Sequence, residues 1–238
     1  MALGSQPRWM ARTAEAEVGI DVGLRQYMLR IYNYMASGLA LTGIVAYVAA
    51  SSSFYQRIAQ SGAIWLVILA PLALVMVLSF GVQKMRASTA QALFWVYSAL
   101  MGLSLGLIFL IYTETSIARV FFITGGTFAA MSLYGYTTRR DLSQWGSFLF
   151  MGLIGIIIAS LVNMFLASSA MQFAISVIGV IVFTGLTAWD TQQIKEMYYA
   201  ADGEEVAAKK AVMGALRLYL DFINLFMMLM QLLGTRRD

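Results

Sequence analysis

The sequence has no cysteine and no histidine among its 238 residues. Without cysteine the chain can form neither a disulfide nor a thiolate metal site. Without histidine it lacks the side chain that most often carries protons near neutral pH, and also the commonest metal ligand. Any response to pH near neutrality must therefore come from carboxyl groups in unusual surroundings.

Charged residues are also scarce, at 12% of the chain, whereas 60% of the residues are hydrophobic. Soluble domains contain about 25% charged residues. Apolar runs of about 20 residues recur, each long enough to cross a hydrocarbon core about 30 Å thick. Continuous runs without alternation exclude a β-barrel, so we predict an all-α polytopic membrane protein. Seven membrane segments are predicted, at residues 27–50, 64–82, 90–112, 117–136, 147–166, 171–192 and 212–233.

The polar stretch before the first apolar run, residues 1–25, is predicted to be a cytoplasmic tail, and residues 26–238 a seven-helix membrane domain. Lys and Arg in short loops set the orientation of such proteins. With the N-terminus inside, only Arg57 and Arg119 fall in outer loops, and the net charge of +4 requires no nucleic-acid partner. The inner segments then hold Arg8, Arg12, Arg25, Arg30, Lys84, Arg86, Arg139, Arg140, Lys195, Lys209 and Lys210.

Two further basic residues, Arg236 and Arg237, follow the last segment and do not fit this orientation if residues 212–233 cross the membrane completely. Either the segment spans despite them, or it returns partway as a re-entrant helix. The two alternatives place the C-terminus on opposite sides of the membrane.

Two acidic residues interrupt the last two apolar segments. Asp190 lies near the cytoplasmic end of segment 171–192, and Asp221 lies roughly 9 residues into segment 212–233. A charge at the middle of a bilayer costs at least about 2.5–3.5 kcal/mol, so such residues usually face the bundle interior and carry function. Two carboxylates within about 4–6 Å cannot easily both ionise. We therefore predict that the pair shares a proton and titrates jointly.

Polar neighbours with helical spacing extend this pair into an inward seam. Arg217, Asp221 and Asn224 share one helix face, and Gln193 shares a face with Asp190. In the alternative interpretation, Arg217 simply neutralises Asp221 within its helix, while Asp190 bonds nearby backbone. The spacing is compatible with both.

The residues around both acids are similar to a known family. "AWDTQQI" (residues 188–194) and "LYLDFINLF" (residues 218–226) resemble the Bax inhibitor-1 family, as does "LRIYNYMASGLALTG" in the first segment. The resemblance covers nearly all of residues 26–234. It implies seven helices, with the last lying centrally among the other six.

The resemblance also implies a function, a pH-sensitive calcium leak across the membrane. Asp190 and Asp221 match the family's aspartate pair, which acts as sensor and gate. Lys84 and Arg86 both lie near the position of a basic residue that stabilises the closed state. Arg217 departs from the family pattern and would favour the ionised form of the neighbouring carboxyl group.

Calcium binds six to eight oxygens in a flexible shell. The pair Asp190 and Asp221, with Asn224, Gln193 and backbone carbonyls, is expected to offer only a weak and transient calcium site. Weak binding suits permeation, because a tightly held ion does not leave. Calcium is thus expected as a permeant ion, and no cofactor is predicted.

Two other classes of function are compatible with paired acids in a membrane. An intramembrane aspartyl protease would resemble G-x-G-D at the second acid, whereas "LYL" precedes Asp221 here, so no enzyme activity is predicted. A non-transporting regulator that binds other membrane proteins, such as a quality-control protease, would use the tail 1–25 and the loop 195–211. The short loops, and the lack of a retrieval signal in the final "GTRRD", favour a bacterial inner membrane.

Overall fold

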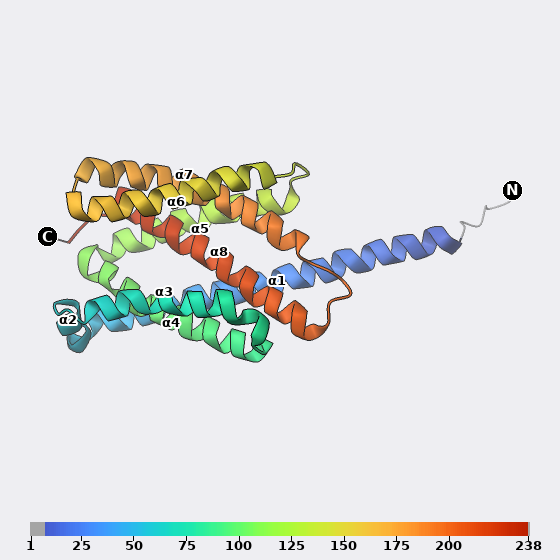
Figure 1. Cartoon of the computed structure of the whole chain (residues 1–238), viewed down its shortest axis with the longest axis horizontal. Coiled ribbons are helices and arrows are strands. Elements are labelled where there is room, and N and C mark those ends of the chain that lie inside the picture. The colour runs from blue at the N-terminus through green and yellow to red at the C-terminus, as the bar shows by residue number, and fades with distance from the viewer. Residues whose placement is uncertain (1–7, 238) are drawn as a thin grey trace.

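A computed structural model describes residues 8–237, with the side chains of 22–237 except residue 54. Long helices account for almost all of this part of the chain (Figure 1). The predicted cytoplasmic tail lies, apart from residues 22–25, outside the described side chains. The elements are α1 (Arg8–Ser51), α2 (Ser53–Ala59), α3 (Ile64–Gly81), η1 (Val82–Lys84), α4 (Ala87–Ile111), α5 (Glu114–Thr137), α6 (Ser143–Leu166), α7 (Ser169–Glu196) and α8 (Glu204–Leu233).

Seven of these helices are long and apolar enough to cross a membrane, which confirms the prediction of an all-α polytopic membrane protein. They are α1 from Val22 onward, α3 with the η1 turn, and α4 to α8. Each helix extends at one or both ends beyond the apolar run from which it was predicted. The added residues are mostly polar or small, and they continue the helix beyond the apolar stretch. The short helix α2 was not predicted. It is only 7 residues long and lies between two spans.

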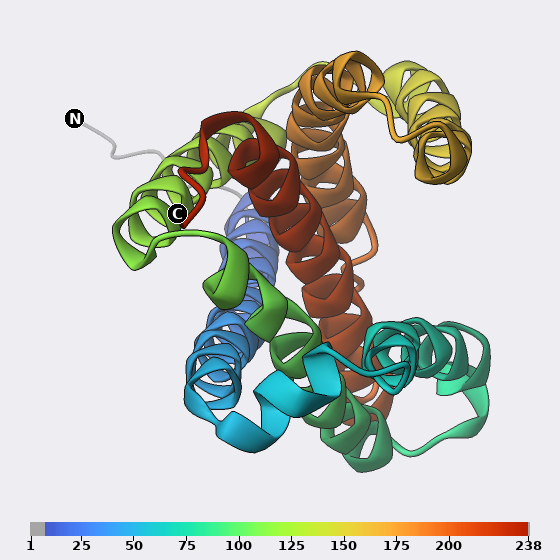
Figure 2. The same cartoon turned by 90° about the vertical axis from the view of Figure 1, so that its left-hand side faces the viewer.

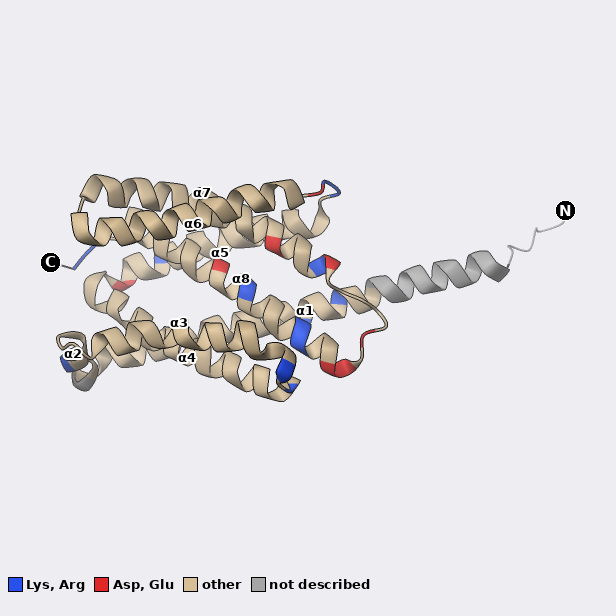
Figure 3. Cartoon of the chain, in the orientation of Figure 1, with Lys and Arg blue, Asp and Glu red and all other residues tan. Residues whose placement is uncertain are grey.

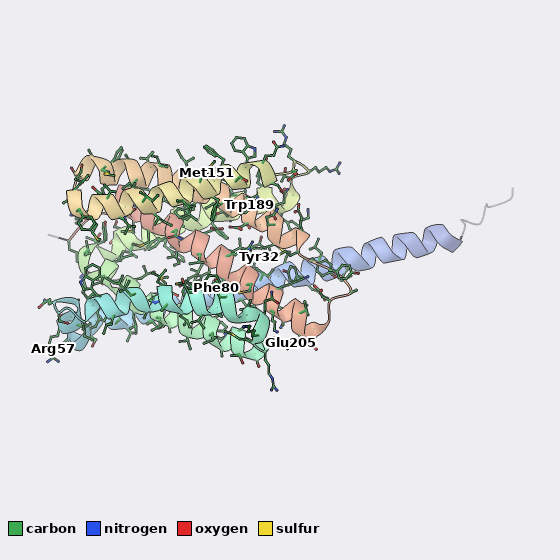
Figure 4. All side chains as sticks on the ribbon, in the orientation of Figure 1. Tyr32, Arg57, Phe80, Met151, Trp189 and Glu205 are labelled. Atoms are coloured by element: carbon green, nitrogen blue, oxygen red, sulfur yellow. The ribbon has the colours of Figure 1, made fainter. Side chains whose placement is uncertain are left out.

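Helix α8 occupies the centre of the bundle and packs against α1, α4, α5 and α7 (Figure 2). In its most apolar stretch 67% of the residues are buried, against 11% in α3 and 17% in α6. The implied arrangement of a last helix surrounded by the others is thus confirmed. The peripheral helices expose apolar side chains such as Phe80 and Met151 (Figure 4), 79% and 64% exposed, as expected for surfaces that face lipid.

Most of the Lys and Arg residues lie at one end of the bundle. Lys and Arg gather at the end formed by the α3–α4, α5–α6 and α7–α8 connections (Figure 3). We call this the basic end; the opposite end holds α2, the α4–α5 and α6–α7 connections and the C-terminus. At the basic end, the connections and the adjoining helix ends carry Lys84, Arg86, Arg139, Arg140, Lys195, Lys209 and Lys210.

Helix α8 runs from one end of the bundle to the other. At the basic end, Glu205 Oε1 accepts a 2.6 Å hydrogen bond from the backbone N–H of Ala87, where α4 begins. At the opposite end, Thr113 N–H donates to the carbonyl of Thr235 at 3.0 Å, just beyond α4. The Arg237 guanidinium also lies 3.2 Å from the Glu114 carboxylate. The last segment therefore crosses the bundle completely, and the re-entrant alternative is wrong.

Close helix packing depends on glycine at two positions. A Cβ atom on Gly102 would lie 2.7 Å from the carbonyl oxygen of Thr42, so α4 can approach α1 only without a side chain there. A Cβ atom on Gly135 would lie 2.1 Å from the carbonyl oxygen of Ala188. Gly135 thus lets α5 touch the backbone of α7 two residues before Asp190.

Candidate functional site

The two acidic residues singled out in the sequence come from neighbouring helices. Asp190 belongs to α7 and Asp221 to α8, and these helices pack against each other. Both residues are buried, at 9% and 5% exposed. Their carboxyl groups are close enough to interact electrostatically and, when one is protonated, as hydrogen-bond partners. Burial of two acids side by side is costly unless a proton or a cation compensates.

A cation reaches this site from the surface of α8. Arg217 Nη1 lies 3.6 Å from Asp190 Oδ1, and the arginine side chain is 47% exposed. The ion pair therefore joins α8 to α7, and within residues 22–237 the salt bridge of Arg217 is made to Asp190 rather than to Asp221 in its own helix. Because the guanidinium is nearly half exposed, we assign the pair no more than about 1 kcal/mol.

Asp221 has an unsatisfied oxygen. Its Oδ2 atom is buried and has no hydrogen-bond partner among the described residues. A buried polar atom without a partner costs roughly 1–3 kcal/mol. Because Arg217 favours the ionised form of Asp190, the proton belongs on Asp221, whose carboxyl group can then donate to the Asp190 carboxylate. The arrangement is thus chemically suited to hold one proton between two acids.

The other residues of the predicted seam form their hydrogen bonds away from the pair. Gln193 Nε2 donates to Glu196 Oε2 at 3.2 Å. Asn224 Nδ2 donates to the carbonyl of Leu220 at 2.9 Å, within its own helix. The structure therefore brings together Asp190, Asp221 and Arg217, but it does not add either amide to them.

The two predicted basic partners lie at the basic end of the bundle. Lys84 closes the η1 turn, and Arg86 immediately precedes α4. Among the ion pairs within residues 22–237, neither takes part, and the cation next to the acids is Arg217. The closed-state role of Lys84 and Arg86 stays a prediction.

Within the described part of the chain, no group of three or more acidic residues is placed to hold a metal ion. Asp190 and Asp221 alone would supply a calcium ion with fewer ligands than the six to eight oxygens it prefers. Water and backbone carbonyls would have to complete such a shell. The weak, transient calcium site stays a prediction.

A chain of hydroxyl groups that the sequence did not reveal ends at Thr191, the residue that follows Asp190. Tyr32 of α1 bonds Ser132 of α5 at 2.7 Å, and Ser132 bonds Thr191 of α7 at 3.0 Å. Thr191 Oγ1 donates to the carbonyl of Thr187 at 2.7 Å, so Ser132 donates to Thr191 and Tyr32 donates to Ser132. The chain ties three helices together one residue from Asp190.

A third acid near the basic end lies in the α5–α6 connection. Asp141 is exposed, and its carboxylate accepts a 2.8 Å hydrogen bond from the backbone N–H of Ser143. Bonds from the Ser143 side chain and backbone lower the pKa of Asp141. This acid is therefore ionised throughout the neutral range and is a suitable control for the buried pair.

Comparison with known proteins matches almost the whole chain. A family model described as "Inhibitor of apoptosis-promoting Bax1" matches residues 24–238. The protein RP147 of Rickettsia prowazekii is 56% identical over 219 residues, which are 92% of this chain and 93% of that protein. The inner membrane protein YbhL of Escherichia coli K12 is 51% identical, over 90% of this chain and 94% of YbhL. A membrane protein of Streptococcus pyogenes serotype M6 is 38% identical over similar shares, 90% and 94%.

Proposed function

Because the chain belongs to the Bax inhibitor-1 family, we propose that this multi-pass membrane protein is a pH-sensitive calcium leak gated by Asp190 and Asp221. The observation that carries the proposal is the buried, unsatisfied Oδ2 of Asp221 beside a second buried acid. A pair that serves only packing would have its oxygens satisfied by donors. A pair that exchanges a proton must keep an oxygen available.

The proposed closed state holds one proton between the two carboxyl groups, at or below neutral pH. Loss of that proton leaves two negative charges together in a low-dielectric interior. Arg217 stabilises the charge on Asp190 only partly, because it is half exposed. Repulsion between the acids then separates α7 from α8 and opens a path. Calcium passes with the ionised carboxylates as weak, temporary ligands.

The alternative function, a non-transporting regulator of other membrane proteins, predicts no ion flux at all. Purified protein reconstituted into liposomes with a calcium indicator separates the two. We expect calcium entry that rises with pH above the level of protein-free liposomes. No flux at any pH would refute the leak and favour a binding role, for example toward a membrane protease.

We also propose a plasma (inner) membrane location with the basic end and the N-terminus cytoplasmic. A reporter inserted between Arg139 and Asp141 should then read cytoplasmic, and one fused to the C-terminus should read periplasmic. The first expectation follows from the positive-inside rule, and the second from the complete crossing by α8. Reporters that read on the same side would contradict the crossing, and a reversed pair would overturn the orientation.

The exposed cation should set the pH at which the leak opens. Arg217→Gln removes the charge that favours ionised Asp190, so the midpoint of the flux–pH curve should move to higher pH by roughly 0.5 to 1 unit. Arg217→Lys should keep most of the wild-type midpoint. Liposome flux measured across a pH series checks the shift, and an unmoved or acid-shifted midpoint in the glutamine variant would contradict it.

Lys84 and Arg86 provide a comparison for Arg217 in the same assay. If either stabilises the closed state, neutralising it should raise the resting flux more than exchanging it for the other basic residue does. Unchanged flux in Lys84→Gln, Arg86→Gln and their double variant would remove both residues from the mechanism. They would then be plain determinants of orientation.

A further inference from the structure

An apolar groove lies between α1 and α5. Both helices pack against α8 (Figure 2), and α8 lines only the half of the groove away from the basic end, with Phe222, Ile223 and Phe226. Two adjoining cavities of about 500 and 490 Å³ make up the groove, and both include Leu39 of α1. The half toward the basic end is lined mainly by apolar residues, among them Met28, Met35, Ala36, Phe128 and Ala129.

The length and position of the groove match the bilayer. On α1 its lining runs from Arg25 to Ala46, which at 1.5 Å per residue is about 32 Å. The hydrocarbon core of a bilayer is about 30 Å thick. Since both walls are membrane spans, the groove faces the acyl chains of the bilayer lipids.

The two mouths of the groove differ in their charged residues. Arg25 lines the mouth at the basic end, two residues after Gly23, where an added Cβ atom would meet the Tyr198 side chain just beyond α7. Lys195 lies beside the same mouth, with its Nζ 5.4 Å from the centre of the Tyr136 ring. The other mouth has Glu114, which already pairs with Arg237. An anionic head group therefore fits the basic end and not the opposite one.

From this geometry we infer a lipid site: the half-groove at the basic end binds one acyl chain of an anionic phospholipid from the adjacent leaflet, with its phosphate at Arg25. Tyr32 and Ser132 line this half, and their hydrogen bond crosses from α1 to α5. The bound acyl chain thus packs beside the hydroxyl groups of Tyr32 and Ser132. Ser132 in turn bonds Thr191, which follows Asp190 in the sequence. The site does not depend on whether the protein conducts calcium.

A groove-filling substitution tests the site. Ala36→Trp should displace the acyl chain, whereas Leu66→Trp adds the same ring to α3 at a position 74% exposed and outside the groove. Protein purified in mild detergent from membranes of mixed anionic and zwitterionic phospholipid is analysed by native mass spectrometry. Wild type and Leu66→Trp should each retain about one anionic phospholipid per chain, and Ala36→Trp should lose most of it.

Further variants separate the head-group contact from the chain contact. Ala129→Trp fills the groove from α5 and should also lose the bound anionic phospholipid. This variant keeps the test valid if Ala36→Trp does not fold. Arg25→Gln should keep a bound lipid but lose the preference for anionic over zwitterionic lipid. Equal retention in wild type and both groove-filling variants would overturn the site. So would a wild-type dimer without bound lipid that Ala36→Trp dissociates, because the groove would then be covered by a second copy of the chain.

Discussion

Liposomes containing Asp190→Asn or Asp221→Asn should show calcium flux that no longer rises with pH. Asparagine resembles a protonated aspartate in shape and can donate to the remaining carboxyl group, so each variant should stay in the closed state. Flux at alkaline pH should fall to the level that wild type shows at acidic pH. A single proton changes the ratio of two states by up to about tenfold per pH unit, and this dependence should be lost.

The double variant should add little to either single variant, because the two acids act as one unit and coupled sites are not additive. Asp141→Asn is the matched control, since Asp141 is an exposed acid outside the pair. It should retain the wild-type pH dependence. If both single variants kept the wild-type pH dependence of flux and were less stable, the two acids would serve only local hydrogen bonds and ion pairs.

Replacing Gly135 by valine should strongly destabilise the protein. The new Cβ atom would lie 2.1 Å from the carbonyl oxygen and 3.0 Å from the Cα atom of Ala188. Both are backbone atoms, so no side-chain rotation relieves the clash and α5 must move away from α7. Overpacking in a rigid interior costs roughly 1–3 kcal/mol or more. We expect a large fall in the apparent Tm or a loss of monodisperse protein.

Gly126→Val on the same helix is the control for this change. A Cβ atom there meets nothing within 4 Å, and valine has a better helix propensity than glycine. The apparent Tm of this variant, followed by size-exclusion chromatography after heating in detergent, should stay near that of wild type. Equal stability of the two variants would contradict the close approach of α5 and α7.

The seven spans were predictable because hydropathy is a local property of the sequence, and each helix needs its own apolar run to cross the membrane. The acids could be selected as a candidate site for a related reason, since a carboxyl group in an apolar run is costly wherever the helix packs. The rotation of each helix was not predictable. Arg217 shares a helix face with Asp221 in the sequence, yet its guanidinium reaches across to Asp190 on α7.

The hydroxyl chain and the groove could not be read from the sequence at all. Tyr32 and Ser132 are 100 residues apart, and Ser132 and Thr191 are 59 residues apart. Serine and threonine in membrane helices usually bond their own backbone, so nothing local marks these residues as a chain. A groove forms where two neighbouring helices do not pack against each other. No local pattern in a single sequence indicates which helices these are.

Isotope-edited infrared spectroscopy of aspartate-labelled protein in lipid bilayers, titrated across neutral pH, observes the shared proton directly. We predict the carbonyl band of one protonated carboxyl group at acidic pH, which disappears as the pH rises over the range in which calcium flux increases. The band should be absent from the Asp190→Asn, Asp221→Asn double variant and unchanged in Asp141→Asn. Two fully ionised aspartates at every pH, or a band that survives in the double variant, would contradict a proton held by Asp190 and Asp221.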